Sequence, residues 1–308
     1  MRILYFNNCW FTNVGEAFID IGGMALIKQV FPEADIACIS AMSDYYISTA
    51  SASNSVKKRF GNRKQEKGCI PVRMEQFVEA DYVVLPGMVG TEEFLNASSR
   101  KMIDELVASG CKVIFLGLGG YEYTEQERIA FSKYIESVNP ALIMSRDNVV
   151  YDYYKDVAEC VKGIDCAFWS IDQFDPRGFS VKDYDVVTFN RSDEPNIFKE
   201  WKKPVIRPWH MQYGFDNRGE RESVLISDTP YDYLTVYANA NNVYTDLVHA
   251  SIISLMYNVP VKYWYIDKRS YAFEALNGII MQEFMSVSPE KLKAQKVDVV
   301  KKMKEKLG

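Results

Sequence analysis

The sequence contains few of the residues that bind transition metals. Among its 308 residues there are two histidines, His210 and His249, and none of the six cysteines belongs to a CxxC pair. Structural zinc sites are built from closely spaced Cys and His ligands. A Cys/His zinc site is therefore not expected.

The sequence also lacks an excess of positive charge and long apolar runs. Its formal net charge is −5, which argues against a protein that binds nucleic acid by neutralising many phosphates. No apolar stretch reaches the roughly 18 residues of a membrane helix, and the apolar run at residues 1–6 is too short for a signal peptide. We therefore expect a cytoplasmic protein that does not bind nucleic acid.

What is present is the pattern of an α/β protein with ordinary globular composition, 48% hydrophobic and 25% charged. Short apolar runs alternate with helical patterns, which is typical of βα units around a parallel sheet. The predicted strands of the first series are residues 2–6, 35–39, 82–85, 112–116 and 141–144. The predicted helices between and after them are residues 16–30, 92–109, 125–137 and 148–155.

A second series begins after residue 180 or so. Its predicted strands are residues 185–189, 223–226, 243–244 and 261–265, and its predicted helices are residues 231–240, 246–257 and 271–280. Residues 168–183 show little periodicity and form the predicted boundary, which gives domains at residues 1–170 and 180–308. Two α/β domains in series predict a cleft lined by the carboxyl ends of strands from both sheets.

Two segments lie outside this alternation. The polar stretch at residues 43–68 is predicted to be a loop excursion from the first domain. The tail at residues 289–308 is predicted to be a helix with one apolar stripe, Leu292, Val299, Val300, Met303 and Leu307. Its lysine-rich face suggests a peripheral contact with an anionic membrane, whereas packing on its own protein is the alternative that we favour.

Polar residues lead from the first strand into the first helix. Asn13-Val14-Gly15-Glu16 precedes the apolar part of that helix, and a helix N-terminus presents free N–H groups and a positive dipole end. Glu16 is a candidate general base, although a glutamate in a first turn also simply complements the dipole. Either interpretation is open from these residues.

Glycines and arginines follow other strands. Gly87 and the turn Gly117-Leu118-Gly119-Gly120 let a ligand approach the backbone, but no GxGxxG follows the first strand and no P-loop occurs. Arg146 follows the fifth strand, ahead of the candidate N-cap Asp147, and Arg191 opens the second series. In a cleft, each guanidinium would suit a phosphate or carboxylate; a surface ion pair is the alternative.

The most informative segment runs from Val243 to Ser251. Thr245 or Asp246 is predicted to cap a helix, which places His249 in the first turn, near the mouth of the cleft. A histidine after a strand is a candidate for acid–base chemistry. His210 lacks such a context.

Together these motifs resemble the polysaccharide pyruvyl transferase family over residues 2–276. Asn13–Glu16 is similar to the family's N-x-G-D/E, residues 80–87 to its strand that ends in glycine, and Ser145-Arg146-Asp147 to its R-D motif. Gly117–Gly120 resembles its glycine-rich turn and Asp165-Cys166-Ala167-Phe168 its D-x-A-F segment. Thr245–Ala250 with Asn258-Val259-Pro260 resembles the T-D-R-L-H-A helix and its G-x-P exit.

The resemblance implies an α/β fold with two Rossmann-like domains in a GT-B-like arrangement, facing each other across a cleft, with the predicted C-terminal helix at the end. It also implies a transferase that moves pyruvate from phosphoenolpyruvate to a sugar of a cell-surface polysaccharide or its precursor, without metal or cofactor. The acceptor can be a free or a lipid-linked saccharide. The first domain would hold the acceptor, through Asn13 and Gly15, and the second the donor. His249 and Glu16 would be catalytic.

One departure concerns the donor. Where the family has arginine before L-H, this chain has Leu247. Besides Arg146 and Arg191, the cations Lys268 and Arg269, which follow a strand, are candidate donor-binding residues. The alternatives are a GT-B glycosyltransferase that uses a nucleotide-sugar donor and a catalytically degenerate sugar-binding member of the family.

Overall fold

Six parallel strands form the first sheet. The computed structural model describes residues 1–7, 13–40, 79–91, 94–95, 98–179, 183–210, 222–227, 229–264, 268–276 and 282–308, so the excursion predicted at residues 43–68 lies outside the described residues. The strands are β1 (Arg2–Asn7), β2 (Asp35–Ser40), β3 (Tyr82–Pro86), β4 (Lys112–Leu118), β5 (Leu142–Ser145) and β6 (Cys160–Lys162), in the order β2-β1-β3-β4-β5-β6. Five were predicted; β6 was missed because only Val161 of its three residues is buried, so no apolar run marks it.

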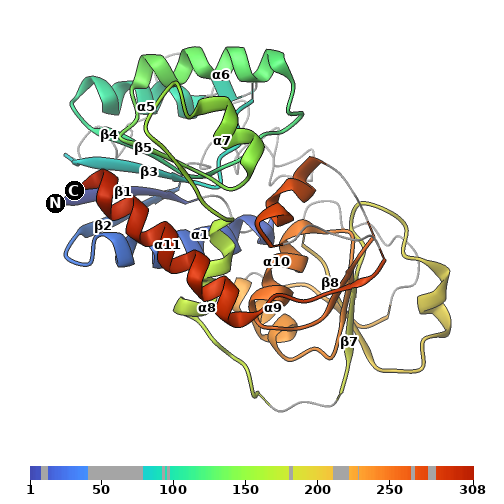
Figure 1. Cartoon of the computed structure of the whole chain (residues 1–308). Helices are drawn as coiled ribbons and strands as arrows, with labels where there is room; N and C mark the ends of the chain where they lie inside the picture. The colour runs from blue at the N-terminus through green and yellow to red at the C-terminus, as the bar shows by residue number, and fades with distance from the viewer. Residues whose placement is uncertain are drawn as a thin grey trace, which may run out of the picture.

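Helices cover both faces of this sheet. Those on one face are α5 (Ser98–Ala108), α6 (Glu125–Val138) and α7 (Asn148–Tyr154), and the other face is covered by α1 (Val14–Val30) (Figure 1). Successive side chains of β1 point to opposite faces of the sheet. Leu4 and Phe6 join the core beneath α6, whereas Ile3 and Tyr5 join the core around α1. A sheet buried on both faces explains why its strands appear in the sequence as continuous apolar runs.

The second sheet is mostly parallel and also has six strands. These are β7 (Asp185–Thr188), β8 (Val205–Pro208), β9 (Val224–Leu225), β10 (Val243–Thr245), β11 (Val261–Tyr263) and β12 (Phe284–Met285), in the order β12-β11-β10-β7-β8-β9. Only β12 runs antiparallel, against β11. The predictions missed β8 and β12, both at most four residues long.

The helices that connect the strands of this half are the 3-10 helix η4 (Asn196–Glu200), α9 (Pro230–Ala238), α10 (Val248–Met256) and the 3-10 helix η5 (Lys268–Leu276). Residues 271–280 were predicted to be an α-helix, so the type was wrong for the part that is described. The helix α1 packs against α9 and α10 as well as its own sheet, and residues of both halves belong to one continuous core. That shared core fixes the two halves against each other.

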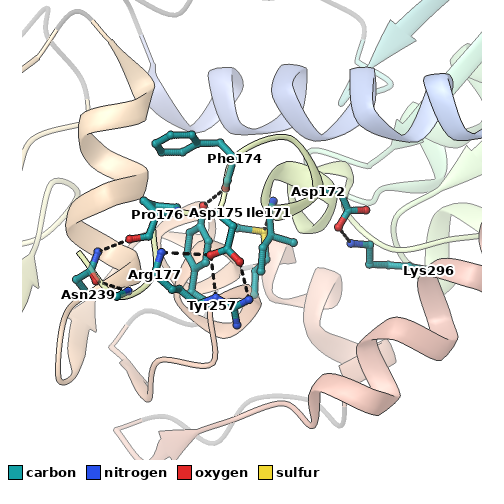
Figure 2. A network of polar contacts seen from close by, with 11 residues as sticks. Ile171, Asp172, Phe174, Asp175, Pro176, Arg177, Asn239, Tyr257 and Lys296 are labelled. Carbon is teal, nitrogen blue, oxygen red and sulfur yellow. Dashed lines mark hydrogen bonds and ion pairs between the residues drawn. The ribbon is translucent and has the colours of Figure 1, made fainter. Parts of the chain in front are cut away.

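The chain crosses from one half to the other through the 3-10 helix η3 (Cys166–Trp169) and α8 (Ser170–Gln173). Both pack on α1, with Phe168 and Trp169 fully buried. Figure 2 shows how the following residues are held: the Tyr257 hydroxyl donates to the Phe174 carbonyl at 2.8 Å, and the Asn239 amide donates to the Pro176 carbonyl at 3.1 Å. The predicted boundary is therefore a segment with many polar anchors.

The C-terminal helix α11 (Pro289–Leu307) is confirmed, capped by the Ser288 hydroxyl. Figure 1 shows it running back across the molecule, and it packs on α1, β5 and β6 of the first half. Leu292, Val299 and Met303 are buried there. Two of its lysines form ion pairs: Lys296 with Asp172 of the crossover, and Lys306 with Glu159 of the first half. Among the described helices, none combines the length and the apolar character needed to cross a membrane.

Candidate active site

A cavity of about 260 Å³ lies between the carboxyl ends of the strands of the two sheets. Five of the eight predicted site residues line it: Asn13, Glu16 and Arg146 from the first half, and Arg191 and His249 from the second. Parallel strands end at one edge of their sheet, and the shared core turns those two edges toward each other. Residues more than 200 positions apart in the sequence thus meet in one place.

Asn13 organises the start of α1. It is the N-cap: its side-chain carbonyl accepts from Gly15 N–H at 3.0 Å, and its amide donates to a Glu16 carboxylate oxygen at 3.2 Å. The Val14 N–H donates across the cleft to the His210 carbonyl at 3.0 Å. These contacts hold Glu16 in the first turn of α1, facing the cavity, so its capping role and its chemical role are compatible.

His249 is the second residue of α10 and lies directly against α1 of the other half. A Cβ on Gly15 would stand 2.2 Å from His249 Nδ1 and 2.9 Å from its Cγ, well inside van der Waals contact. Glycine at position 15 is therefore required by the imidazole. Gly15 was predicted to contact the acceptor; the structure gives it a separate task, which is to make room for His249.

Arg146 is buried at the end of β5. Its guanidinium packs on Gly119, where a Cβ would be 2.3 Å from Nε, and one terminal nitrogen lies 3.4 Å from an Asp165 carboxylate oxygen. Burial acts to lower the pKa of Arg146, but the charges around it, Asp165 foremost, raise it overall. The neighbouring Asp147 caps α7 as predicted, accepting from Val150 N–H at 2.7 Å.

The expectation that Thr245 or Asp246 caps α10 was wrong. The N-cap residue is Leu247, with no side-chain cap bond. The Thr245 hydroxyl accepts from Leu247 N–H at 2.9 Å, just before the helix, and Asp246 turns away to the loop after β7 that carries Arg191. The N–H groups of the loop after β7 bind this carboxylate in place of the N–H groups of α10. The local sequence around Asp246 gives no sign of them.

His210 is a cavity-lining residue that the sequence analysis did not select. It follows β8, where only Val205 and Ile206 precede Arg207, so no apolar run marks a strand there. The Nε2 of His210 shares a 2.7 Å hydrogen bond with the Tyr237 hydroxyl. Rings of Phe18, Tyr233 and Tyr237 meet it edge-on at 5.7–5.8 Å. Burial, with a smaller effect of His249, lowers the pKa of His210 to about 3, so His210 is neutral at physiological pH.

The cavity wall includes further residues that the sequence analysis named. Leu247, at the position of the family's arginine, does line the cavity, as do Gly87 and Gly120 from the glycine-containing turns. Tyr121, also in the lining, was not singled out. The backbone of Lys268 and Arg269 belongs to η5, but their side chains lie outside the described residues. Among the residues that the structure describes, no cluster of His, Cys, Asp and Glu is arranged to hold a metal ion.

Solved structures with the same architecture are numerous and remote in sequence. The chain superposes on an S. aureus MnaA–UDP co-structure with a TM-score of 0.56 and 12% identity, covering 99% of this chain and 90% of the other. A putative UDP-N-acetylglucosamine 2-epimerase from Listeria monocytogenes gives 0.54 and 10%, with 100% and 90% coverage. The UDP-GlcNAc 2-epimerase of Methanocaldococcus jannaschii, in complex with UDP-GlcNAc and UDP, gives 0.52 and 12%, with 100% and 93% coverage. At such identities the likeness shows the fold, a GT-B-like pair of α/β domains.

Sequence comparison gives a more specific result. No curated protein sequence matches this chain. The family model described as polysaccharide pyruvyl transferase, however, matches residues 13–261, which span the cavity-lining loops from Asn13 to His249. The chain belongs to the polysaccharide pyruvyl transferase family, and it is accordingly a transferase.

Proposed function

We propose that this transferase moves a pyruvyl group from phosphoenolpyruvate to a sugar of a cell-surface polysaccharide or its precursor. The observation that carries the proposal is that Arg146, Arg191, His249 and Glu16 line one cavity from opposite halves. Two guanidinium groups suit a donor that bears a phosphate and a carboxylate. An imidazole and a carboxylate suit the two proton transfers that the reaction needs.

The reaction balances without an external reductant or oxidant. A sugar hydroxyl oxygen bonds to C2 of phosphoenolpyruvate while a proton is added to C3. A second hydroxyl of the sugar then bonds to C2 as the C2–O bond to phosphate breaks, which leaves a cyclic ketal and free phosphate. One hydroxyl proton replaces the proton given to C3, and the other leaves with the phosphate or through a base. No metal or other cofactor enters this scheme.

The residues divide these tasks by position. His249 supplies the proton to C3 or contacts the phosphate, and Glu16, tied to Asn13, receives a proton from the acceptor hydroxyl. Arg191 and Arg146 hold the donor anion, with Lys268 and Arg269 as further candidates. We assign the larger part of donor affinity to Arg191, because it opens the second half, where a GT-B-like architecture is expected to hold the donor. In this arrangement the acceptor lies on the first half and the donor on the second, with Arg146 reaching the donor from the first half.

The acceptor class and location follow from the same proposal. A sugar has the vicinal or 1,3-related hydroxyls that a cyclic ketal needs, and phosphoenolpyruvate is a cytoplasmic metabolite, so the enzyme would act in the cytoplasm. A lipid-linked acceptor would bring it to a membrane surface. The lysine-rich face of α11 is the candidate for that peripheral contact, although its apolar stripe is occupied by packing.

The test is calorimetric titration of the protein with phosphoenolpyruvate, followed by assay of phosphate release with a panel of sugars. We expect binding at micromolar to millimolar phosphoenolpyruvate and a product heavier than the acceptor by one pyruvyl ketal. If the protein binds no phosphoenolpyruvate at millimolar concentration, the proposal fails.

A nucleotide-sugar donor is the alternative that the same titration examines. The observation in its favour is Leu247 in the cavity wall, where the family has a cation, together with a fold shared with proteins solved with UDP or UDP-GlcNAc. Binding of UDP-GlcNAc but not phosphoenolpyruvate would select a glycosyltransferase. Binding of sugars without turnover of either donor would select a catalytically degenerate sugar-binding protein.

A further inference from the structure

Asp246 is a buried carboxylate whose hydrogen bonds within the described part of the chain go to one short loop. It is fully buried, and its two oxygens accept from the backbone N–H groups of Asn190 at 3.1 Å, Arg191 at 2.9 Å and Ser192 at 2.7 Å. The Ser192 hydroxyl donates a fourth bond at 3.0 Å. A buried charge is tolerated only when hydrogen bonds replace its lost hydration, and four donors on two oxygens meet that requirement.

The strand order explains why this carboxylate reaches that loop. β7 and β10 are parallel neighbours, with Thr188 beside Thr245 at their ends. The loop after β7 carries Arg191, and the loop after β10 carries Asp246 and leads into the first turn of α10 with His249. One side chain therefore joins the two loops of the second half that present these residues to the cavity.

The loop after β7 is held at other points as well. The Asn190 side-chain carbonyl accepts from His210 N–H at 2.8 Å, and Glu194 forms a bidentate pair with Arg207 of β8 at 2.8 and 2.9 Å. Both anchors flank Arg191 without touching its own N–H. The carboxylate of Asp246 is what fixes the backbone at Arg191 itself.

We propose that Asp246 is a positioning residue for donor binding: it fixes the backbone of Arg191 relative to His249, so that anion anchor and imidazole act on one donor molecule. The inference rests on the proposed function, in which Arg191 binds the donor. Asp246 contacts no substrate in this scheme. It acts through the loop.

The variant Asp246→Asn tests this inference with little change in shape. The amide replaces an accepting oxygen by an N–H₂ donor, which opposes the N–H groups of the loop. We expect affinity for phosphoenolpyruvate to fall by about tenfold or more, the size of one charge-assisted hydrogen bond. Ser192→Ala, which removes only the hydroxyl bond, should weaken binding in the same direction by a few-fold, and it serves if Asp246→Asn does not fold.

A double-mutant cycle separates positioning from general damage. If Asp246 acts through Arg191, adding Asp246→Asn to Arg191→Ala should change phosphoenolpyruvate affinity by less than about twofold, because the group being positioned is gone. Asp185→Asn is the matched control. Asp185 is equally buried in the same sheet, at the opposite end of β7, and accepts from Trp201 and Asn242 at 3.0 Å. The Asp185→Asn substitution should lower the free energy of unfolding and leave donor affinity unchanged.

Hydrogen exchange provides a readout that needs no donor. The Arg191 and Ser192 amides should exchange slowly in the wild type and at least about tenfold faster in Asp246→Asn, while the Asp185→Asn protein keeps them protected. Unchanged exchange, or a fully additive cycle, overturns the role of Asp246 and leaves the proposed function intact. Absence of phosphoenolpyruvate binding by the wild type overturns the proposed function, and the exchange result then still decides whether Asp246 holds the loop.

Discussion

The imidazole of His249, in the second half, occupies the space where any side chain on Gly15, in the first half, would stand. The gap between an added Cβ and Nδ1 would be 2.2 Å, about a third less than ordinary van der Waals contact. Because Gly15 has no side chain, the imidazole of His249, the candidate acid, can lie against the first turn of α1, beside Asn13 and Glu16.

The substitution Gly15→Ala should reduce transfer strongly without unfolding the protein. Alanine is a better helix former than glycine by roughly 1 kcal/mol, so α1 itself tolerates it, but the imidazole must move by an ångström or more. A displacement of that size costs about a hundredfold in rate. Steady-state turnover and a melting curve measure the two effects, and in a His249→Ala background the same substitution should cost nothing further.

Replacement of His249 by alanine should leave the melting temperature close to that of the wild type and lower transfer by at least about a hundredfold, as expected for a general acid or base. His249 lies at the cavity wall near the start of α10 and is only partly buried, so truncation of its side chain should cost little stability. Near-normal turnover of the variant would contradict the assignment.

Arg191→Ala and Arg146→Ala should separate into different phenotypes. Both should raise the apparent donor constant, because each removes a charged contact to an anion. Only Arg146→Ala should also destabilise the fold, by about 3 kcal/mol, since it leaves the buried Asp165 carboxylate without its cation. Denaturant unfolding and donor titration, performed on both variants, check this division.

His210 should make stability fall as the pH is lowered from 7 to 5. Its folded-state pKa is about 3, below the unfolded value of about 6.5, so in this window the unfolded chain binds a proton that the folded protein does not. The stability contributed above the unfolded pKa is lost as the pH falls, amounting to about 2 kcal/mol by pH 5. His210→Gln should show a flatter profile of unfolding free energy over the same range; an equal slope would contradict neutral burial.

Leu247→Arg should tighten phosphoenolpyruvate binding by about ten- to a hundredfold, because a charged hydrogen bond contributes roughly 1.5–3 kcal/mol. Leu247 is 7% exposed and borders the cavity, so the new guanidinium can reach an anion there. Without ligand the same charge is partly desolvated, and the free protein should be less stable. Calorimetry and melting curves on both proteins measure the two effects; weaker binding by the arginine variant would contradict the prediction.

The local pattern of the sequence determined the elements and their order. Continuous apolar runs marked β1, β3, β4 and β5, because strands buried on both faces carry apolar residues at successive positions. The apolar stripe of residues 289–308 marked α11. Five site residues could be predicted because they follow strands: Asn13, Glu16, Arg146, Arg191 and His249. In parallel sheets, side chains of different loops converge at the carboxyl ends of the strands.

Tertiary structure decided what depends on partners distant in sequence. Nothing local to Asp246 distinguishes a helix cap from a carboxylate that holds the loop after β7, because the donors come from residues 190–192. His210 became a cavity residue through β8, where Val205 and Ile206 are followed at once by Arg207, so no apolar run marks the strand. The need for glycine at position 15 comes from the packing of α10 against α1. A contact between the two halves depends on how their cores join, and the periodicity of neither half reveals it.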